Sequence, residues 1–274
     1  MGYYPPRVLA ADARRCGVAV LPPDVNRSCE CYTVEDGAIR VSLGQVKGIT
    51  GEAIASILQE REKGRFTSLR DFVLRVDASQ PALENLVKVG ALDAFGSRKG
   101  MLAEIPALLQ FKRRNVGTYL QVCPEVSNAG TYLQVRPDKR ESLLAERELL
   151  SLDLSAHPLD FCNLQNGFTR IKDLPSLPAG QAIKIAGSVI RYQTPPTRSG
   201  KRVVYVIIED GTGVADVTVF NDVQERCGKV LFRCGWLEVR GKIQRRGPKA
   251  LSIIADELKP LKTNSNIQVP GSKQ

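Results

Sequence analysis

The sequence predicts an α+β protein in which a helical region precedes a small β-barrel. Residues 51–114 place apolar side chains at helical spacing in short runs, several of which follow Ser or Thr and end near Gly. From residue 181 onward apolar and polar residues alternate in five runs, a pattern typical of strands. The chain has 274 residues, 43% hydrophobic and 25% charged, which is enough for more than one globular domain.

The first 44 residues are expected to form a short helix, a strand and a β-hairpin. Residues 5–15 have a helical pattern, and residues 18–26 indicate a strand that two prolines end. In CYTVEDGAIRVSL two alternating runs flank Asp36-Gly37, a dipeptide typical of two-residue hairpin turns.

Four helices are expected next, and a fifth after a break in the pattern. The four have the sequences GEAIASILQERE, TSLRDFVLRV, PALENLVKVG and SRKGMLAEIPALLQFKRR. Between residues 115 and 139 the periodicity is lost, and GTYLQV occurs at 117–122 and again at 130–135. Two copies cannot form a stacked repeat array, so we expect a linker with a local duplication. ESLLAERELLSL resumes the helical pattern, and HPLD closes it.

The β region has the element order of an OB-fold barrel. Its strand-like runs are QAIKIAGSVIRYQ, KRVVYVIIED, VADVTVF, WLEVRGKIQ and ALSIIADELKPL. One helical run, NDVQERCGKVLF, lies between the third and the fourth. Few small β-domains place their only helix there, so this order is more specific than any single strand.

The positive charge of the chain is concentrated on this barrel. The net charge is +10 and the pI about 9.4, which favours polyanionic partners. Residues 181–262 hold 15 Lys and Arg against 8 Asp and Glu, a net charge of +7. The loops TPPTRSGKR and QRRGPK fall where an OB-fold places the two loops beside its binding face. Exposed turns also favour Lys and Arg for solubility, but two basic loops on one rim favour phosphate binding.

Residues of these loops and strands are therefore expected to contact nucleic acid. Single-strand binders combine a basic groove with aromatic rings on which bases stack. The sequence leaves open whether the rings of the barrel stack on bases or pack in the core; they are Tyr192, Tyr205, Phe220 and Trp236. The expected nucleic-acid-binding residues are Arg198, Lys201, Arg202, Tyr205, Phe220, Lys242, Arg245, Arg246 and Lys249.

In the helical region, KGITGEAIASIL resembles the turn of a helix-hairpin-helix motif. There a Gly-hydrophobic-Gly loop presents backbone N–H groups at a helix N-terminus to a DNA phosphate, without reading the base sequence. Thr50 takes the place of the second glycine, and Gly48 alone would also suit an ordinary turn. The residues expected to contact duplex DNA are Lys47, Gly48, Ile49, Thr50 and Gly51.

The residues give no support to a catalytic, metal or cofactor site. RSGKR differs from a phosphate-binding P-loop because Pro195 occupies the place of the required first glycine. His157 is the only histidine and the seven cysteines contain no CxxC pair, so neither a metal centre nor a disulfide framework is expected. No stretch approaches the roughly 18 apolar residues of a membrane span, so we expect a cytoplasmic protein without a membrane partner.

Taken in order, several segments resemble the C-terminal part of the bacterial C-family DNA polymerases, the DNA polymerase III alpha subunit and its error-prone paralogue. The most specific are PPDVNRS and AHPLD. The others are GYYPPRVLAADARRCGVAVL, the KGITGEAIASIL turn, FTSLRDFVLRVD, LVKVGALDAFG, ERELLSLDLS and RSGKRVVYVIIEDGTGVADVTVF. The resemblance covers nearly the whole chain except the duplicated linker and the last residues.

The resemblance implies an order of domains and a set of partners. The domains are the end of a fingers-like region with the β-hairpin at 1–44, a helix-hairpin-helix region at 45–114, the linker at 115–140, a connecting helix with HPLD at 141–180, an OB-fold domain at 181–262 and a tail at 263–274. The implied partners are duplex and single-stranded DNA, together with polymerase catalytic domains or other replisome proteins.

Departures from the family pattern refine this expectation. Thr50, and Ser151 and Ala156 where the family usually has glycines, favour a divergent or error-prone type. In the family the palm with its catalytic aspartates precedes the matched region, so this chain is not expected to polymerise DNA alone. We therefore expect a non-catalytic DNA-binding portion of such a polymerase, used in replication or repair synthesis. Two alternatives stay open: a free-standing single-strand-binding or regulatory protein, and a tRNA-binding OB protein.

Overall fold

A computed structural model describes residues 4–114, 138–162, 164, 167–196, 202–245, 247 and 250–261. The chain forms two compact units, Gly17–Ser155 and a second made of Met1–Cys16 with Ala156–Gln274. The first is helical with a small sheet and the second is built on a β-barrel, which confirms the predicted α+β class. Both copies of GTYLQV and the tail 263–274 lie outside the described residues.

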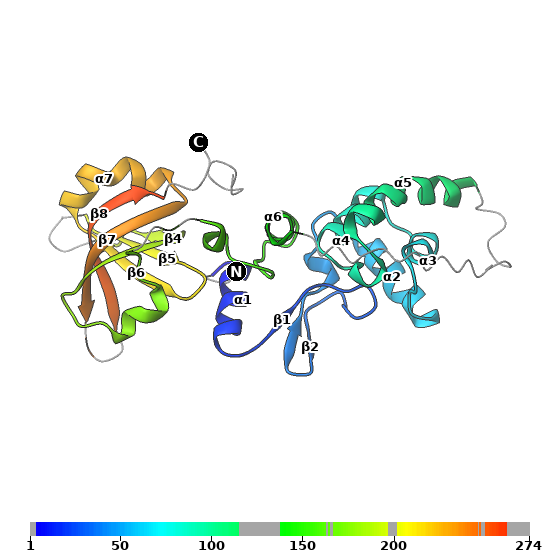
Figure 1. Cartoon of the computed structure of the whole chain (residues 1–274), viewed down its shortest axis with the longest axis horizontal. Helices are drawn as coiled ribbons and strands as arrows, with labels where there is room; N and C mark the ends of the chain where they lie inside the picture. The colour runs from blue at the N-terminus through cyan, green and yellow to red at the C-terminus, as the bar shows by residue number, and fades with distance from the viewer. Residues whose placement is uncertain are drawn as a thin grey trace. The chain divides into compact units, whose positions relative to one another are not determined.

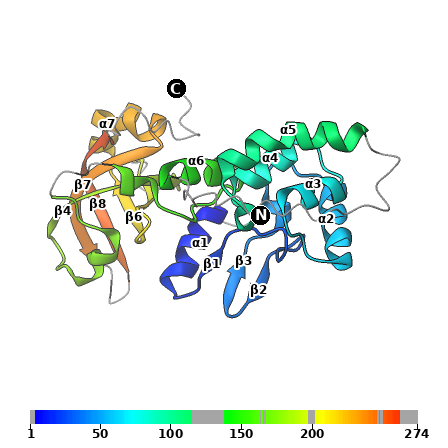
Figure 2. The same ribbon diagram turned by 45° about the vertical axis from the view of Figure 1, so that its right-hand side comes forward.

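The predicted hairpin is present in the unit Gly17–Ser155. Strands β2 (Thr33–Glu35) and β3 (Ala38–Arg40) are antiparallel, and β1 (Val20–Leu21) pairs with β3 in parallel. Figure 2 shows β2 and β3 side by side. Asp36 and Gly37 have φ angles of 51° and 77°, the left-handed values that a two-residue turn between twisted strands requires.

Five α-helices follow in the described part of this unit, and specific side chains hold their ends. They are α2 (Gly51–Lys63), α3 (Leu69–Arg75), α4 (Gln80–Lys88), α5 (Arg98–Arg114) and α6 (Lys139–Leu149). The hydroxyl oxygens of Ser68 and Ser79 accept hydrogen bonds from backbone N–H groups in the first turns of α3 and α4. Nζ of Lys112 in α5 donates to the carbonyls of Val73 (3.1 Å) and Val76 (2.6 Å) at the end of α3.

The helices of this unit share an apolar core. Its large, fully buried side chains include Ile57, Phe72, Leu83, Leu86 and Ile105. They come from α2, α3, α4 and α5, on the helix faces that the periodicity indicated. One face of helix α2 is therefore packed, with Ala53, Ile54 and Ile57 buried, and the first residues of the helix, Gly51 and Glu52, are exposed.

The second unit holds a closed barrel and helix α1 (Pro6–Arg15). Its strands are β4 (Ala182–Gln193), β5 (Val204–Glu209), β6 (Val214–Val219), β7 (Trp236–Arg245) and β8 (Leu251–Pro260). Around the barrel the order is β4-β5-β6-β8-β7, with β6 and β8 parallel. Helix α7 (Asn221–Arg233) connects β6 to β7, so the number of strands and the place of the helix are as predicted (Figure 1).

Two glycines permit the barrel strands to approach each other closely. The first half of β4 pairs with β7 and its second half with β5, so the strand must bend. A Cβ atom at Gly187 would lie 2.5 Å from the carbonyl oxygen of Glu209, and one at Gly241 would lie 2.2 Å from the carbonyl oxygen of Ile254. No side chain fits at either position without moving backbone.

A buried carboxylate links three segments of the barrel unit. The side chain of Glu209 is 1% exposed, and Oγ of Ser188 donates to its Oε1 at 3.0 Å. Nε2 of His157 lies 3.5 Å and Nε of Arg7 3.8 Å from the same oxygen. Burial alone would raise the pKa of Glu209, but the nearby His157, Ser188 and Arg7 hold this pKa below its usual range. His157 also caps the short helix η3 (Pro158–Phe161), so its ring has a structural role.

Gly241→Ala is expected to destabilise the protein by about 1–3 kcal/mol, because the added methyl group forces β7 away from β8. Gly228 in α7 is the matched control, since a Cβ atom there meets nothing within 4 Å. Gly228→Ala should be stabilising by up to about 1 kcal/mol through helix propensity. Urea unfolding measures both changes, and equal stability of the two variants would show that the close approach at Gly241 is wrong.

The pH dependence of stability should depend on Glu209. Because its pKa is lowered in the folded state, its charge contributes stability that is present above the unfolded pKa of about 4.3 and is lost as pH falls through the folded value. Glu209→Gln should be less stable than the wild type at neutral pH and lose less stability on acidification. Urea unfolding over a pH series tests this, with Glu148→Gln on the exposed side of α6 as the control. A variant that retained the full acid sensitivity of the wild type would count against this assignment.

Candidate nucleic-acid interface

The turn Lys47–Gly51 lies at the exposed N-terminus of α2. Gly48 has a φ of 84°, and a Cβ atom there would also lie 3.1 Å from Nδ2 of Asn85. The first N–H groups of a helix have no acceptor within the helix, and the helix dipole makes this end electropositive. Lys47, Gly48, Thr50 and Gly51 are exposed, and Ile49 is half-buried. This turn can therefore bind an anionic oxygen through backbone donors.

Thr50 replaces the second glycine of the motif because it caps α2. Its φ is −92°, so no left-handed conformation is needed at this position, and its Oγ1 accepts a hydrogen bond from the N–H of Ala53 at 3.2 Å. Threonine is among the preferred residues at a helix N-cap. A threonine directly before an apolar helical run is the sequence signal of an N-cap. The same threonine departs from the helix-hairpin-helix motif, which has a glycine at this position.

Two neighbouring helices hold this turn in place. Nδ2 of Asn85 in α4 donates to the carbonyl of Lys47 at 2.9 Å, and the N–H of Lys47 donates to the carbonyl of Leu149 in α6 at 2.8 Å. Close by, Nε2 of Gln45 donates to the carbonyl of Leu150 at 2.6 Å. The supporting residues Asn85 and Gln45 were not predicted, since their partners lie 38 and 105 residues away and no local pattern indicates them.

The two basic loops of the barrel fall partly outside the described residues. The expected contacts Arg198, Lys201, Arg246 and Lys249 lie there. Arg202 and Lys242 are described, and both are exposed. Nε2 of Gln224 in α7 donates to the carbonyl of Arg202 at 2.9 Å, which ties the end of the first loop to the helix.

Arg245 has a structural partner that the sequence did not indicate. Its Nη2 donates to the carbonyl of Pro175 at 2.6 Å and to that of Leu177 at 2.9 Å. These carbonyls lie at the end of the short helix η4 (Ile171–Ser176), before the barrel begins. The guanidinium of Arg245 therefore fixes the segment that enters the barrel.

The candidate rings divide into two pairs. The hydroxyl of Tyr192 donates to the carbonyl of Leu231, and burial raises the pKa of Tyr192 to about 12. The ring of Trp236 packs edge-on to His157, with centroids 6.0 Å apart. Tyr192 and Trp236 are thus part of the packed structure.

Tyr205 and Phe220 are the more accessible pair. Tyr205 is half-buried, and it alternates on β5 with Val204 and Val206, which belong to the barrel core. The side chain of Tyr205 therefore lies on the outer face of the barrel. Phe220 directly precedes α7 and is 39% exposed. Either ring can stack on a base.

A chain of ion pairs compensates part of the barrel charge. Glu238 pairs with Lys184 (3.2 Å) and Arg240 (3.4 Å), and Glu257 pairs with Arg240 (3.7 Å) and Lys259 (2.8 Å). These residues lie on the outer face of β4, β7 and β8. The net charge of +7 for residues 181–262 therefore overstates the positive charge that is open to a ligand.

No helix among the described residues is both long enough and apolar enough to cross a membrane.

Comparison with protein families identifies both units. Residues 17–102 match the helix-hairpin-helix motif family, and residues 183–261 match the family of OB-fold nucleic acid binding domains. These matches confirm the predicted helix-hairpin-helix region and the predicted OB-fold barrel.

Curated relatives match nearly the whole chain. An error-prone DNA polymerase of Symbiobacterium thermophilum is 34% identical over 96% of this chain. DNA polymerase III subunit alpha of Thermus aquaticus is 34% identical over 78%, and an error-prone DNA polymerase of Mycolicibacterium paratuberculosis is 32% identical over 94%. The aligned regions are 29%, 19% and 23% of these relatives, so the chain spans less than a third of their length.

Arg245→Ala and Lys242→Ala are expected to have different effects. The first removes two charge-assisted hydrogen bonds and should lower the free energy of unfolding by about 1–3 kcal/mol, with little change in the salt dependence of DNA binding. The second should leave stability unchanged and reduce the log-log salt slope of single-strand binding by about 0.7, the value for one phosphate. Urea unfolding and fluorescence anisotropy measure the two quantities. A reduced salt slope for Arg245→Ala would show instead that the side chain of Arg245 contacts a phosphate.

Proposed function

This chain is homologous to the C-terminal region of bacterial DNA polymerase III alpha subunits and error-prone DNA polymerases, and from that premise we propose that it is the DNA-binding portion of such a polymerase. In this proposal the helix-hairpin-helix region binds duplex DNA, and the OB barrel binds the single-stranded template. The task of these units is to position DNA during replication or repair synthesis. The departures at Thr50, Ser151 and Ala156 favour a divergent or error-prone type.

The observation that carries the proposal is the fixed turn at the start of α2. Gly48, Thr50 and Gly51 are exposed, and hydrogen bonds from Asn85 and to Leu149 hold Lys47 before any ligand arrives. Donors in this arrangement suit a phosphate oxygen, which every nucleotide offers. The proposed duplex contacts are Lys47, Gly48, Ile49, Thr50 and Gly51.

The barrel contributes charge and rings for a single strand. Arg202 and Lys242 are exposed cations, and Tyr205 and Phe220 are accessible rings. Stacking on such rings does not depend on sequence, because every base has a π-face. The proposed single-strand contacts also include Arg198, Lys201, Arg246 and Lys249, with Arg245 in a supporting role.

A second candidate is a tRNA-binding protein, and a third is a free-standing single-strand-binding or regulatory protein. OB barrels serve all three functions, so the fold does not separate them. The helix-hairpin-helix match favours DNA, because phosphate contact at that turn suits a duplex.

The proposal predicts tightest binding to a junction of duplex and single strand. A primed template should bind more tightly than blunt duplex, bare single strand or tRNA in fluorescence anisotropy titrations over a salt series. Log affinity should fall with log salt by about 0.9 per phosphate on duplex and about 0.7 on single strands. Tighter binding of tRNA than of the junction would favour the second candidate, and preference for bare single strand would favour the third.

Two substitutions should separate the two units. Lys47→Ala is expected to reduce the salt slope on blunt duplex by about 0.9 and leave single-strand binding unchanged. Tyr205→Ala is expected to weaken single-strand binding by about 1–3 kcal/mol and leave duplex binding unchanged. Lys139→Ala, at an exposed position of α6, is the control and should change neither. If both variants lost binding to both forms of DNA, the assignment of one form to each unit would fail.

A further inference from the structure

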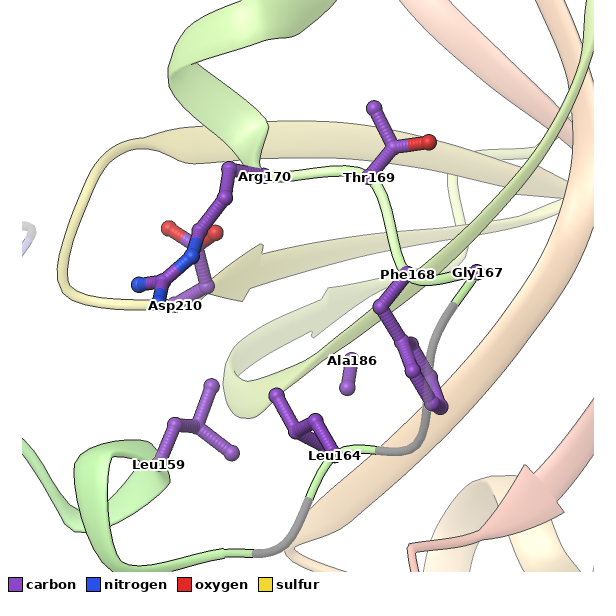
Figure 3. Close-up of a pocket in the computed structure, with 8 residues that line it drawn as sticks. All are labelled: Leu159, Leu164, Gly167, Phe168, Thr169, Arg170, Ala186 and Asp210. Carbon is purple, nitrogen blue, oxygen red and sulfur yellow. The ribbon is translucent and has the colours of Figure 1, made fainter.

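A pocket of about 210 Å³ lies beside β4, between this strand and the segment that leads into it (Figure 3). Its apolar lining comes from Leu159, Leu164 and Ala186. Figure 3 shows the ring of Phe168 on one side, Arg170 and Asp210 on the other, and Ala186 between them. The lining residues all belong to the barrel unit.

Hydrogen bonds and one cation–π contact fix the walls of this pocket. The N–H of Thr169 donates to the carbonyl of Lys184 at 2.7 Å, which joins the entering segment to β4. Nζ of Lys184 lies 3.9 Å from the centre of the Phe168 ring. The ring is thus held at the edge of the pocket.

The acidic residue of the pocket is already satisfied. Asp210 is 5% exposed, and its Oδ2 accepts from the N–H of Ile171 at 2.8 Å. Its Oδ1 accepts from the N–H and the hydroxyl of Thr212 and from the N–H of Gly213. These donors offset the negative charge of Asp210, so the carboxylate acts as part of the wall.

The lining of the pocket includes one cation that faces solvent. Arg170 is exposed, and within the described ranges it forms no ion pair. The phosphate of a ligand bound in the pocket would meet this cation.

Size and chemistry together define the ligand. A cavity of about 150 Å³ lined by apolar side chains admits a benzene ring, so a pocket of about 210 Å³ accommodates a six-membered aromatic ring. We propose that this pocket binds one base of a single-stranded nucleic acid, with the base beside Phe168 and its phosphate toward Arg170. This inference rests on the proposed function and adds a base-binding site at the turn after β5, apart from the two basic loops.

A protein side chain is the competing occupant. The apolar side chains of the lining suit it equally well, but the exposed Arg170 favours a ligand that carries a phosphate. A free mononucleotide offers the same chemistry as a base in a strand. We assign the strand because Ala186 and Asp210 lie within the region that matches OB-fold nucleic acid binding domains.

The contribution of the pocket is measured by comparing the binding of a strand that carries bases with the binding of a strand that lacks them. The probes are a labelled oligothymidylate of about 12 nucleotides, which suits one OB fold, an abasic strand of the same length, and thymidine monophosphate. Ala186→Leu fills the pocket and Phe168→Ala removes its ring. Phe232→Ala is the matched control, because Phe232 lies on α7 and is 51% exposed. Thermal unfolding establishes that each variant folds.

Ala186→Leu and Phe168→Ala are each expected to weaken oligothymidylate binding by about 5- to 150-fold, the equivalent of 1–3 kcal/mol for one stacked base. Binding of the abasic strand should be unchanged in both, and Phe232→Ala should change neither probe. Oligothymidylate affinity unaffected by both pocket variants would overturn the inference and leave a protein side chain as the occupant.

The remaining outcomes separate this inference from the function on which it rests. Monophosphate binding that is abolished by Ala186→Leu, together with unchanged strand binding, would overturn the assignment to a strand in favour of a free nucleotide. Absence of wild-type binding to both strands would overturn the single-strand part of the proposed function. If the wild type binds oligothymidylate and the abasic strand equally well, only the pocket proposal is overturned.

Discussion

Closure of the barrel by β4 is the constraint on which the barrel unit depends. One half of this strand pairs with β7 and the other with β5, so the sheet has no free edge between them. A bend of this kind requires register shifts and close approach of backbones, which Gly187 and Gly241 permit. β5 pairs only with the second half of β4. In the first half of β4, the carbonyl of Lys184 accepts a hydrogen bond from the N–H of Thr169. One strand therefore positions the pocket as well as the start of the first basic loop.

Charged groups in this unit serve two different purposes. Glu209 is buried and Arg245 is half-buried, and each joins segments that are far apart in the sequence. The ion pairs on β7 and β8 are more exposed, and surface pairs of this kind contribute only about 0–1 kcal/mol each. Arg202 and Lys242 remain exposed and belong to neither group. A count of charges cannot separate these purposes, because each cation adds the same amount to the net charge.

Local patterns were sufficient to predict nearly every helix and strand. Asp36-Gly37 determines the hairpin through left-handed backbone angles, and serines mark the starts of α3 and α4. The contacts that complete the site were not predictable. Asn85 supports Lys47 across 38 residues, and Arg245 reaches Pro175 across 70. Such pairs depend on tertiary packing, which leaves no periodic signal in one sequence.

The turn at the start of α2 has an evolutionary consequence, because it offers backbone groups where other sites offer side chains. Every residue except proline carries the same N–H group. Exposed residues such as Gly51 and Glu52 can therefore change by mutation without removing a donor. Selection should act instead on Gly48, which must adopt a left-handed φ, and on Asn85 behind it. At this surface we therefore expect the backbone conformation at Gly48 and the supporting side chain of Asn85 to be conserved, while neighbouring exposed side chains are free to diverge.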